Sequence, residues 1–477
     1  MKRLPMFDGA LSGERLEDQL PDAKPLYSPG QARAEAERCL YCSDAPCIRA
    51  CPTEIDIPTF IKKIATDNVL GAARTILTQN ILGYSCARVC PVEVLCVGSC
   101  VYNEWHREPI QIGKLQRFAT EQALKAEASG GPRIFTPKPA APGARRVALV
   151  GAGPASLACA AYLALEGHRP VIFEKRALPG GLNSTGVAPY KLHLADSLAE
   201  VSYVLSLGVE LRQGAVGENV SAEELLRDFD AVFLGLGLGD DSRLGIPGED
   251  GPGVHGATAF IERLKTDRKL RLDGVRRALV VGGGNTAIDV ARELAQLGVS
   301  DVAMVYRRER ASMSGYAHEM ALARIEGVRL IECATPVAVL RDGDRVTGLR
   351  VSISGAEAGE RDLPADGIFL AIGQSKLRAV ASLFPSVALD GRGCVVVDPR
   401  SRRTGNPKVY AGGDCINGGK EVVNAAADGR EAARAMIQGW ASAEAALWQI
   451  FPSTCAASRA PTPSGSPARP RPTAASR

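Results

Sequence analysis

Eight cysteines between residues 39 and 100 have the spacing of metal-centre ligands. The first four form the pattern C-x2-C-x4-C-x3-C-P and are Cys39, Cys42, Cys47 and Cys51. The other four are Cys86, Cys90, Cys96 and Cys100. Short C-x2-C and C-x3-C steps bring thiolates together on one metal centre. The sequence therefore predicts two iron–sulfur clusters near the N-terminus, and electron transfer as the chemistry of this region.

Other uses of these thiols fit the sequence less well. The run that ends in Cys51 and Pro52 is similar to the bacterial ferredoxin pattern, in which the cysteine before the proline binds the other of two clusters. Disulfides would need an oxidising compartment, and the charged N-terminus shows no secretory signal. Structural zinc usually has two paired C-x2-C steps, whereas only one is present here. Clusters are therefore favoured over zinc and over disulfides.

A glycine-rich turn at residues 151–156 has the sequence Gly-Ala-Gly-Pro-Ala-Ser and lies between an expected strand, 147–150, and an expected helix, 155–166. Its first glycine permits a tight turn, and its second lets the backbone approach a pyrophosphate at the helix N-terminus. Glu174 ends the next strand, where a carboxylate can bind a ribose hydroxyl. These features predict a dinucleotide site that includes Gly151, Gly153, Pro154, Ala155, Ser156 and Glu174. The uncharged stretch 147–165 has the length of a membrane span, but its early glycines and proline favour a strand, a turn and a helix.

A second turn of this kind, G-x-G-x-x-A from Gly282 to Ala287, precedes a helix that should reach Leu297. The following strand ends in Arg307 and Arg308 instead of an acid, and arginines there can pair with a 2′-phosphate, which favours NADP. A solvated basic turn is the open alternative, because the neighbouring Glu309 could bind a ribose instead. A later strand ends in Ala371-Ile372-Gly373, which should pass under the nicotinamide nucleotide.

Two further glycine motifs point to a flavin. Gly180-Gly181-Leu182 leaves backbone room for a cofactor, and residues 409–414 form a strand that ends in Gly412-Gly413-Asp414. Asp414 could also be a simple helix cap. The combination resembles the two-dinucleotide fold of flavoprotein disulfide reductases, in which the Gly-Gly-Asp element closes the FAD site. That order implies a nicotinamide domain inserted in the flavin domain, and hydride transfer between the two cofactors. No Cys-x4-Cys pair follows the first strand–helix unit, so the electrons should leave through the clusters.

From about Ser28 to Gln438, the chain resembles two relatives. They are the glutamate synthase small subunit and the N-terminal half of dihydropyrimidine dehydrogenase, which bacteria make as a separate flavin subunit. Three segments favour the pyrimidine enzyme, namely Cys39-Leu-Tyr-Cys42-Ser-Asp-Ala-Pro-Cys47, the 151–156 turn and Ile112-Gly-Lys-Leu-Gln116-Arg-Phe118. In that family the glutamine is an unusual cluster ligand, and glutamate synthase subunits carry a glutamate at the similar place.

The resemblance implies particular ligands. One cluster would take Cys39, Cys42, Cys47 and Cys100, and the other Cys51, Cys90, Cys96 and Gln116, which leaves Cys86 as a spare thiol. The implied flavin neighbours are Val89, Glu174, Gly181, Leu182, Lys191, Gly413 and Asp414, although the family has arginine where Lys191 stands. The implied nicotinamide contacts are Gly282, Gly284, Asn285, Thr286, Arg307, Arg308, Ala371 and Gly373. No ligand role is implied for Cys159, Cys333, Cys394, Cys415 and Cys455.

The resemblance also implies a function. NAD(P)H would reduce FAD, and two [4Fe–4S] clusters would carry single electrons to a partner subunit with FMN and iron–sulfur clusters, which reduces uracil or thymine. A heterotetramer is implied. The alternatives are a glutamate synthase small subunit or related electron-donor flavoprotein, and a non-catalytic electron-transfer scaffold. The choice between NAD and NADP stays open.

Length and composition agree with a globular protein of about three domains, since the chain has 477 residues, 45% hydrophobic and 23% charged. A net charge of +4 is too small to indicate nucleic acid or membrane as a partner, and we expect a cytoplasmic protein. The expected class is α/β, with an all-α iron–sulfur domain and two Rossmann-like domains, one inserted in the other. The expected parts are an iron–sulfur domain at 1–127, a linker at 128–146, flavin-domain halves at 147–256 and 376–441, a nicotinamide domain at 257–375 and a disordered tail at 453–477.

Overall fold

The structure is a computed structural model that describes residues 8–140, 143–355 and 358–450. Contacts within the chain separate a first unit, Met1–Met436, from a second, Ile437–Arg477. The last helix, α17 (Val422–Ile450), begins in the first unit and ends in the second. The expected disordered tail at 453–477, with Cys455, lies outside the described residues. Within the described part, no helix is both long and apolar enough to cross a membrane.

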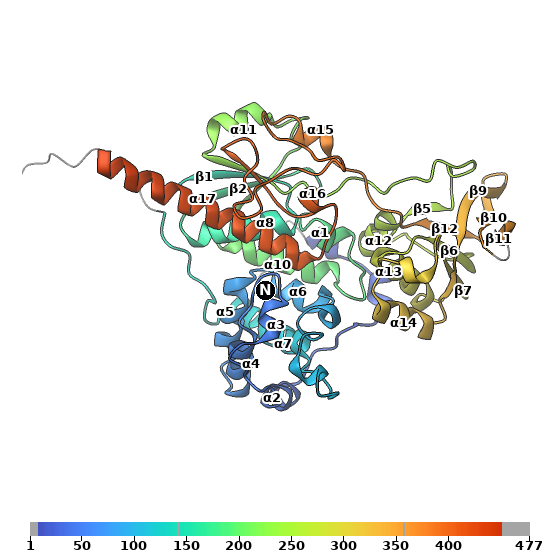
Figure 1. The fold of residues 1–477 in the computed structure, drawn as a ribbon, viewed down its shortest axis with the longest axis horizontal. Coiled ribbons are helices and arrows are strands. Elements are labelled where there is room, and N and C mark those ends of the chain that lie inside the picture. Colours follow the sequence, from blue (N-terminus) through green and yellow to red (C-terminus); the bar gives the residue numbers. More distant parts are fainter. Residues whose placement is uncertain (1–7, 141–142, 356–357, 451–477) are drawn as a thin grey trace, which may run out of the picture. The chain divides into compact units, whose positions relative to one another are not determined.

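The first part of the chain is helical, and no strand occurs in the described residues before Arg146. We call the region from α2 to α7 the helical domain (Figure 1). Its elements, with the two short ones that precede it, are α1 (Asp8–Leu11), η2 (Leu16–Gln19), α2 (Pro29–Glu37), α3 (Pro46–Arg49), α4 (Ile57–Ala65), α5 (Val69–Gln79), α6 (Gly83–Val89), η3 (Val92–Val94), η4 (Val101–Asn103) and α7 (Ile112–Ala128).

Local sequence explains the helices of this domain. Ser28 caps α2 by accepting a hydrogen bond from the Gln31 backbone, and the Gln31 side chain bonds back to Ser28, which is a capping box. Asp56 caps α4 in a similar way. In α4 the buried residues Ile57, Phe60, Ile61 and Ile64 recur at the three- and four-residue spacing of one helix face. That face packs in a core that also contains thiols of the predicted cluster ligands.

The first Rossmann domain contains a five-stranded parallel sheet in the order β13-β4-β1-β2-β3. Its strands are β1 (Arg146–Val150), β2 (Arg169–Glu174), β3 (Glu210–Gln213), β4 (Ala231–Leu234) and β13 (Val409–Ala411). Its helices are α8 (Pro154–Leu165), α9 (Leu182–Thr185), α10 (Leu194–Ser206), α11 (Ala222–Asp228), α15 (Arg378–Ala381), α16 (Asp414–Asn417) and the start of α17. Val409 pairs with Val232, although the whole second Rossmann domain lies between them in the chain. The predicted insertion of one domain in the other is confirmed.

The second Rossmann domain has a five-stranded parallel sheet in the order β5-β12-β6-β7-β8. Its parallel strands are β5 (Val254–Gly256), β6 (Arg277–Val281), β7 (Asp301–Val305), β8 (Arg329–Ile331) and β12 (Gly367–Leu370). Its helices are α12 (Ala257–Thr266), α13 (Asn285–Gln296), η5 (Arg310–Ser312) and α14 (Ala317–Ile325). The domain also carries an antiparallel sheet of β9 (Ala334–Asp342), β10 (Arg345–Ile353) and β11 (Gly359–Pro364), which the sequence interpretation did not include.

Two chain segments connect the Rossmann domains, and they run side by side. The Gly239 amide donates to the Ser375 carbonyl (2.9 Å), and the Ser375 amide donates to the Asp240 carbonyl (2.9 Å). The Ser242 amide donates to the Gly373 carbonyl (2.8 Å). The covalent link between the two domains is therefore a short two-stranded ribbon.

Candidate electron-transfer site

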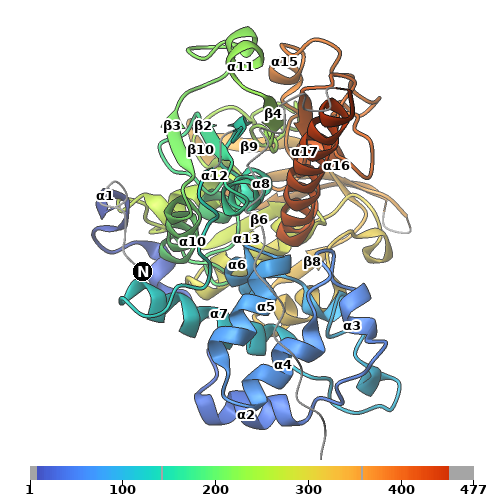
Figure 2. The same cartoon turned by 90° about the vertical axis from the view of Figure 1, so that its left-hand side faces the viewer.

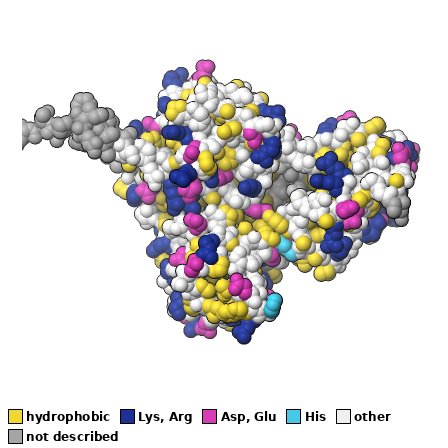
Figure 3. Space-filling model, viewed as in Figure 1, with side chains coloured by type: hydrophobic (Ala, Val, Ile, Leu, Met, Phe, Trp, Pro, Cys, Tyr) yellow, Lys and Arg dark blue, Asp and Glu magenta, His cyan; other side chains and the backbone are white. Residues whose placement is uncertain are grey.

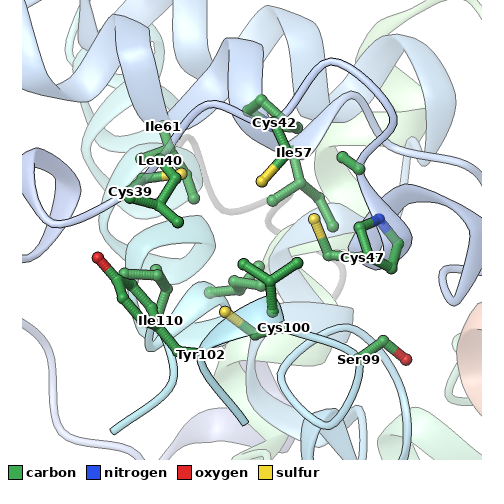
Figure 4. Close-up of a pocket in the computed structure, with 15 residues that line it drawn as sticks. Cys39, Leu40, Cys42, Cys47, Ile57, Ile61, Ser99, Cys100, Tyr102 and Ile110 are labelled. Carbon is green, nitrogen blue, oxygen red and sulfur yellow. The ribbon is translucent and has the colours of Figure 1, made fainter. Parts of the chain in front are cut away.

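Four thiols line one pocket of the helical domain. Cys39 and Cys42 follow α2, Cys47 lies in α3, and Cys100 precedes η4. Figure 4 shows their sulfur atoms directed toward one another across the pocket. The apolar side chains of the pocket wall include Leu40, Ile57, Ile61 and Ile110. The structure thus brings together the four residues that the family resemblance assigned to one cluster.

The chemistry of this pocket fits a positively charged metal centre. Burial, with a smaller contribution from Cys39 and Cys100, raises the pKa of the Cys47 thiol to about 12. Such a thiol is neutral near pH 7 unless a metal stabilises the thiolate. In the described part of the chain, no three His, Cys, Asp or Glu side chains converge as the ligands of a single ion would. The thiols instead stand around the pocket, where Cys39, Cys42, Cys47 and Cys100 would hold a cluster.

The second set of thiols lies deeper. Cys51 and Cys96 are buried and Cys90 is partly buried. Cys51 and Cys96 pack in one core, and Cys90 packs against it. Burial and then the neighbouring Cys51 and Cys90 raise the pKa of Cys96. Cys86 is also near, since its hydrogen bond with Cys90, together with burial, raises the pKa of Cys90. Position alone therefore does not exclude Cys86 as a ligand, as was already true of its spacing.

Gln116 lies on α7 beside the start of α6. Its Nε2 atom donates a hydrogen bond to the Gly83 carbonyl (2.8 Å), and its side chain is buried. Because the amide nitrogen is engaged, the amide oxygen is the atom of this side chain that is left to act as a ligand. This orientation suits the fourth place beside Cys51, Cys90 and Cys96. The ligand role of Gln116 stays a prediction.

The turn between β1 and α8 meets two segments from distant parts of the chain. Gly151 has φ +90°, and a Cβ there would lie 2.6 Å from the Gly235 carbonyl oxygen. A Cβ on Gly181 would lie 2.8 Å from Gly153 Cα, and one on Gly413 would lie 3.1 Å from Ala155 Cβ. Three of the motifs predicted to bind FAD therefore come together around the start of α8.

The start of α8 has the properties of an anion site. Its N-cap residue, Gly153, provides no side-chain cap, so backbone N–H groups of the first turn remain for a pyrophosphate. The Ser156 Oγ and Asn183 Oδ1 atoms are buried and have no hydrogen-bond partner among the described residues. Buried polar atoms normally have such partners, and a bound cofactor or water would supply them. The residues around this turn thus fit a dinucleotide such as FAD.

Glu174 and Asp414 occupy the two predicted acidic positions. Glu174 ends β2, where its Oε2 accepts from the Ala152 amide (2.6 Å) and its Oε1 from the Arg176 amide (2.7 Å). Asp414 accepts from the Lys420 amide (3.1 Å), and burial raises its pKa. Gly413, and not Asp414, is the N-cap residue of α16. The helix-cap interpretation of Asp414 is thus not what the structure shows, whereas the cofactor contacts of both acids stay predictions.

The second glycine turn lies between β6 and α13. A Cβ on Gly282 would lie 2.3 Å from the Ala371 carbonyl oxygen, so the end of β12 lies against this turn. Gly284 begins α13 without a side-chain cap. Half-buried Asn285 accepts from the Tyr316 amide (2.9 Å), and half-buried Thr286 follows it. Beyond β12, Gly373 is exposed. The uncapped N-terminus of α13 is where a nucleotide pyrophosphate would bind.

Arg307 and Arg308 follow β7 and are exposed. Arg308 packs on the Tyr306 ring (5.6 Å from guanidinium carbon to centroid), and in the described part of the chain neither arginine forms an ion pair. Unpaired guanidinium groups at this position suit a phosphate ligand. The neighbouring Glu309 is exposed as well. The structure therefore agrees with both interpretations of this turn, a 2′-phosphate site and a solvated basic turn.

Lys191 makes contacts that the sequence did not predict. Its Nζ atom lies 2.8 Å from Asp289 Oδ1 and 2.9 Å from Glu319 Oε1, both in the second Rossmann domain. Although burial opposes it, the two carboxylates raise the pKa of Lys191. The adjacent Tyr190 hydroxyl donates to Asp289 Oδ1 (2.6 Å). No motif or spacing marked these residues, because they are far apart in the chain. The predicted flavin contact of Lys191 stays a prediction.

The second thiol set lies on the side of the helical domain that contacts the first Rossmann domain. Glu200 Oε1 on α10 accepts from the Tyr84 amide (3.1 Å) and the Ser85 amide (3.0 Å) on α6. Half-buried Val89 ends α6, directly before Cys90. Val423 of α17 packs in the same core as Cys51 and Cys96. Figure 2 shows α5 and α6 next to α10 and the first part of α17.

Comparison with known proteins identifies the family. Residues 145–429 match the family described as pyridine nucleotide-disulphide oxidoreductase, and residues 17–128 match that described as dihydropyrimidine dehydrogenase domain II, 4Fe-4S cluster. The chain is 36% identical over 422 residues to the NAD-dependent dihydropyrimidine dehydrogenase subunit PreT of Escherichia coli K12, covering 88% of this chain and 97% of that one. It is 32% identical over 445 residues to the glutamate synthase [NADPH] small chain of the same strain, covering 87% and 92%. The chain belongs to the family of these two proteins.

The solved structures agree on the fold. Thioredoxin reductase of T. acidophilum matches with a TM-score of 0.52 at 22% identity, over 62% of this chain and 99% of that chain. The predicted family and α/β fold class are thus confirmed, and the protein is an NAD(P)H-dependent oxidoreductase subunit. Iron–sulfur, flavin and nicotinamide cofactors belong to this family. The individual ligand residues and the domain boundaries stay predictions.

Proposed function

We propose that this protein is the electron-input subunit of an NAD(P)-dependent dihydropyrimidine dehydrogenase. In this scheme the FMN and iron–sulfur partner subunit reduces uracil or thymine to the 5,6-dihydro form. The observation that carries the choice is Gln116, a buried side chain whose amide nitrogen donates to the Gly83 carbonyl and whose amide oxygen is left to act as a ligand. By the family resemblance, glutamine is expected at this place in the pyrimidine enzyme and glutamate in glutamate synthase subunits.

The order of the sites supports an electron path that joins the nicotinamide nucleotide, the flavin and the two clusters. FAD supplies hydride acceptance and one-electron release, and iron–sulfur clusters supply one-electron transfer. The uncapped starts of α8 and α13 would bind the two pyrophosphates, and Arg307 and Arg308 would bind the adenosine end of NADP. Cys51, Cys90, Cys96 and Gln116 would hold the cluster nearer the first Rossmann domain, and Cys39, Cys42, Cys47 and Cys100 the cluster farther from it.

The outer cluster site has apolar residues at the protein surface. Leu40, between two predicted ligands, is 46% exposed, and Trp105, which packs edge-on against Tyr102 of the same pocket, is 53% exposed. On the face in Figure 3, a group of hydrophobic side chains lies on the helical domain, with basic and acidic side chains around it. An acceptor subunit that covers Leu40 and Trp105 would bring its own centre close to this cluster.

The cluster assignment is tested by composition. Purified without oxygen, the protein should contain about eight irons, about eight sulfides and one FAD per chain. Cys42→Ser should remove about half of the iron, and Cys394→Ser, at a buried thiol outside both sets, should remove none. Zinc in place of iron, or equal iron in both variants, would contradict the assignment.

The partner is tested by reconstitution. The chain mixed with an FMN-containing dihydropyrimidine dehydrogenase subunit should reduce uracil with NADH or NADPH, and a native mass should show whether the complex is a heterotetramer. The chain alone should reduce dyes but not uracil. The 32% identity to a glutamate synthase small chain supports the second candidate, an electron donor to an amidotransferase. Co-purification with a large amidotransferase subunit would favour it.

A further inference from the structure

Residues 9–24, which we call the N-terminal segment, contact each of the three domains in turn. The first contact is with the second Rossmann domain. Arg268 Nη2 donates to the Gly9 carbonyl (2.8 Å) and to Ser12 Oγ. Leu16 packs against the core of that domain. In Figure 1 the short helix α1 is seen beside α12, the helix that precedes Arg268.

The middle of the segment is a buried ionic cluster. Glu17 is fully buried, and its Oε1 atom accepts from Arg15 Nη2 (2.7 Å). Its Oε2 atom accepts from the Leu194 amide (3.0 Å), at the start of α10 in the first Rossmann domain. Its charge also acts on the buried Lys265 of α12. Burying a carboxylate costs free energy unless it is paired and hydrogen-bonded. The contacts of Glu17 offset that cost.

Lys265 ties the two Rossmann domains together at this point. Its Nζ atom donates to the Asn183 carbonyl (2.9 Å) and to the Val187 carbonyl (3.0 Å), and both acceptors belong to the first Rossmann domain. Burial lowers the pKa of Lys265 to about 8, while the charge of Glu17 acts in the opposite direction. The charge of Glu17 in the N-terminal segment therefore acts on a cation that spans the domain border, as do the charges of Glu293 and Asp196.

The end of the segment reaches the helical domain. The Ala23 amide donates to the Tyr190 carbonyl (2.8 Å), and Lys24 Nζ donates to the Cys90 carbonyl (2.7 Å). Asp22 pairs with the buried Arg117 of α7 (2.6 Å). One continuous stretch of chain thus contacts the second Rossmann domain, the first Rossmann domain and the backbone of a predicted cluster ligand.

The way in which the two Rossmann domains are connected explains why contacts of the N-terminal segment matter for their relative orientation. Apart from side-chain contacts, the second Rossmann domain is attached by the two-stranded ribbon at Gly239 and Ser375. A domain on such a link can change its orientation by small backbone rotations at the link. Hydride transfer requires the nicotinamide to be held against the flavin, and a misplacement of about 1 Å can cost about a hundredfold in rate. Restraints away from the ribbon are therefore needed, and the N-terminal segment adds to those that Tyr190 and Lys191 make with Asp289 and Glu319.

We propose that the N-terminal segment is a strap that fixes the orientation of the second Rossmann domain for hydride transfer, with Glu17 as its central positioning residue. The strap does not touch the glycine turns, so it should affect the rate of flavin reduction and not the binding of the nucleotide. This inference requires only the family's NAD(P)H-dependent chemistry. It is independent of the identity of the partner subunit.

The test uses the full-length protein purified with its cofactors. Glu17→Ala should lower the limiting rate of flavin reduction by NADH or NADPH at least about tenfold, while the half-saturating nucleotide concentration, the FAD content and the iron content stay unchanged. Amide hydrogen exchange should become faster in α12 and in residues 182–187, which Lys265 joins. An unchanged limiting rate would overturn the proposal, as would a rate loss that follows FAD loss in proportion.

A second pair of variants decides the case if Glu17→Ala does not yield a folded protein. Arg268→Ala removes only exposed contacts with the strap. The matched control is Arg271→Ala, since exposed Arg271 bonds only the carbonyls of Arg268 and Leu270 in its own loop. Arg268→Ala should slow flavin reduction about threefold and speed exchange in α1 and α12, and Arg271→Ala should do neither. Equal rates in the two variants would overturn the proposal.

Discussion

The two glycine turns have the same local form but different surroundings. At the first turn, Gly181 and Gly413 come from distant segments and lie against Gly153 and Ala155. At the second turn, a Cβ built on Gly284 would meet only Ser314 Oγ, at 3.5 Å. Two exposed arginines follow the neighbouring strand β7. The first turn thus has two further predicted flavin motifs packed around it, whereas the second is bordered by the end of β12 and by Ser314.

This difference matches the two kinds of ligand that the family uses. A flavin that stays bound through many turnovers gains from enclosure, because closely fitted segments slow its release. A nicotinamide nucleotide must enter and leave in each cycle, so an open site with charged residues at its edge serves it better. Similar sequence motifs therefore have different roles because of what packs around them.

The largest expected effect tests the enclosure itself. Gly181→Val places a branched side chain where a Cβ already lies 2.8 Å from Gly153 Cα, at φ +56°. We expect nearly complete loss of bound FAD, measured as flavin absorbance per chain, because neither the backbone conformation nor the space tolerates valine. Gly391→Ala is the control, since no atom lies within 4 Å of its built Cβ. A normal flavin content in Gly181→Val would show that the first turn is not enclosed.

A reciprocal pair tests which turn binds which ligand. Gly153→Ala and Gly284→Ala each add one methyl group where the protein leaves space, 4.0 Å and 3.5 Å from the nearest atom. We expect Gly153→Ala to weaken FAD binding about tenfold or more and to leave the KM for NAD(P)H unchanged. Gly284→Ala should raise that KM by a similar factor and leave the FAD content unchanged. The opposite pattern would reverse the assignment of the turns.

The free energy of unfolding should depend on pH through the border between the first Rossmann domain and the helical domain. Burial raises the pKa of Glu200 to about 7, from a usual value of 4.5, at the border between α10 and α6. Between these values the folded protein binds more protons than the unfolded chain, so the free energy of unfolding falls as pH rises from about 4.5 to about 7.

Glu200→Gln should remove up to about 3 kcal/mol of this pH dependence, because an amide can keep the bonds to the Tyr84 and Ser85 amides without a charge. Denaturant unfolding at pH 5 and pH 8 measures it. Exposed Glu223→Gln is the control. The same slope in Glu200→Gln and in the unmodified protein would show that Glu200 is not the responsible group.

The smallest expected effect concerns the choice between NADH and NADPH at the second glycine turn. Arg307→Ala should raise the KM for NADPH about tenfold and change that for NADH little, because a charge-assisted hydrogen bond to the 2′-phosphate is lost. Arg329→Ala, whose guanidinium pairs with Asp301 near the other end of β7, is the control. Equal effects of Arg307→Ala on both nucleotides would refute the 2′-phosphate role and favour the solvated-turn interpretation.

The elements near the predicted site followed from local sequence. The strand, turn and helix around Gly151 and Gly282 formed close to where they were expected, since turn geometry and apolar runs act between neighbours in the chain. The β9–β10 hairpin was missed even though Gly343-Asp344, the two residues between the paired Asp342 and Arg345, is a hairpin signal with Gly343 at φ +58°. The turn residues alone were enough to predict this hairpin.

The sequence by itself determined the two kinds of site, because thiol spacing and glycine turns specify chemistry over a few residues. It also indicated the domain order, through the order of those motifs. Only the tertiary structure decided that Gly181 and Gly413 pack against the first turn, that Lys191 pairs with Asp289 and Glu319, and that Glu17 accepts from the Leu194 amide. Such contacts join residues that are far apart in the chain, and no local spacing encodes them. They exist because charges and backbone groups buried at a domain border must find partners there.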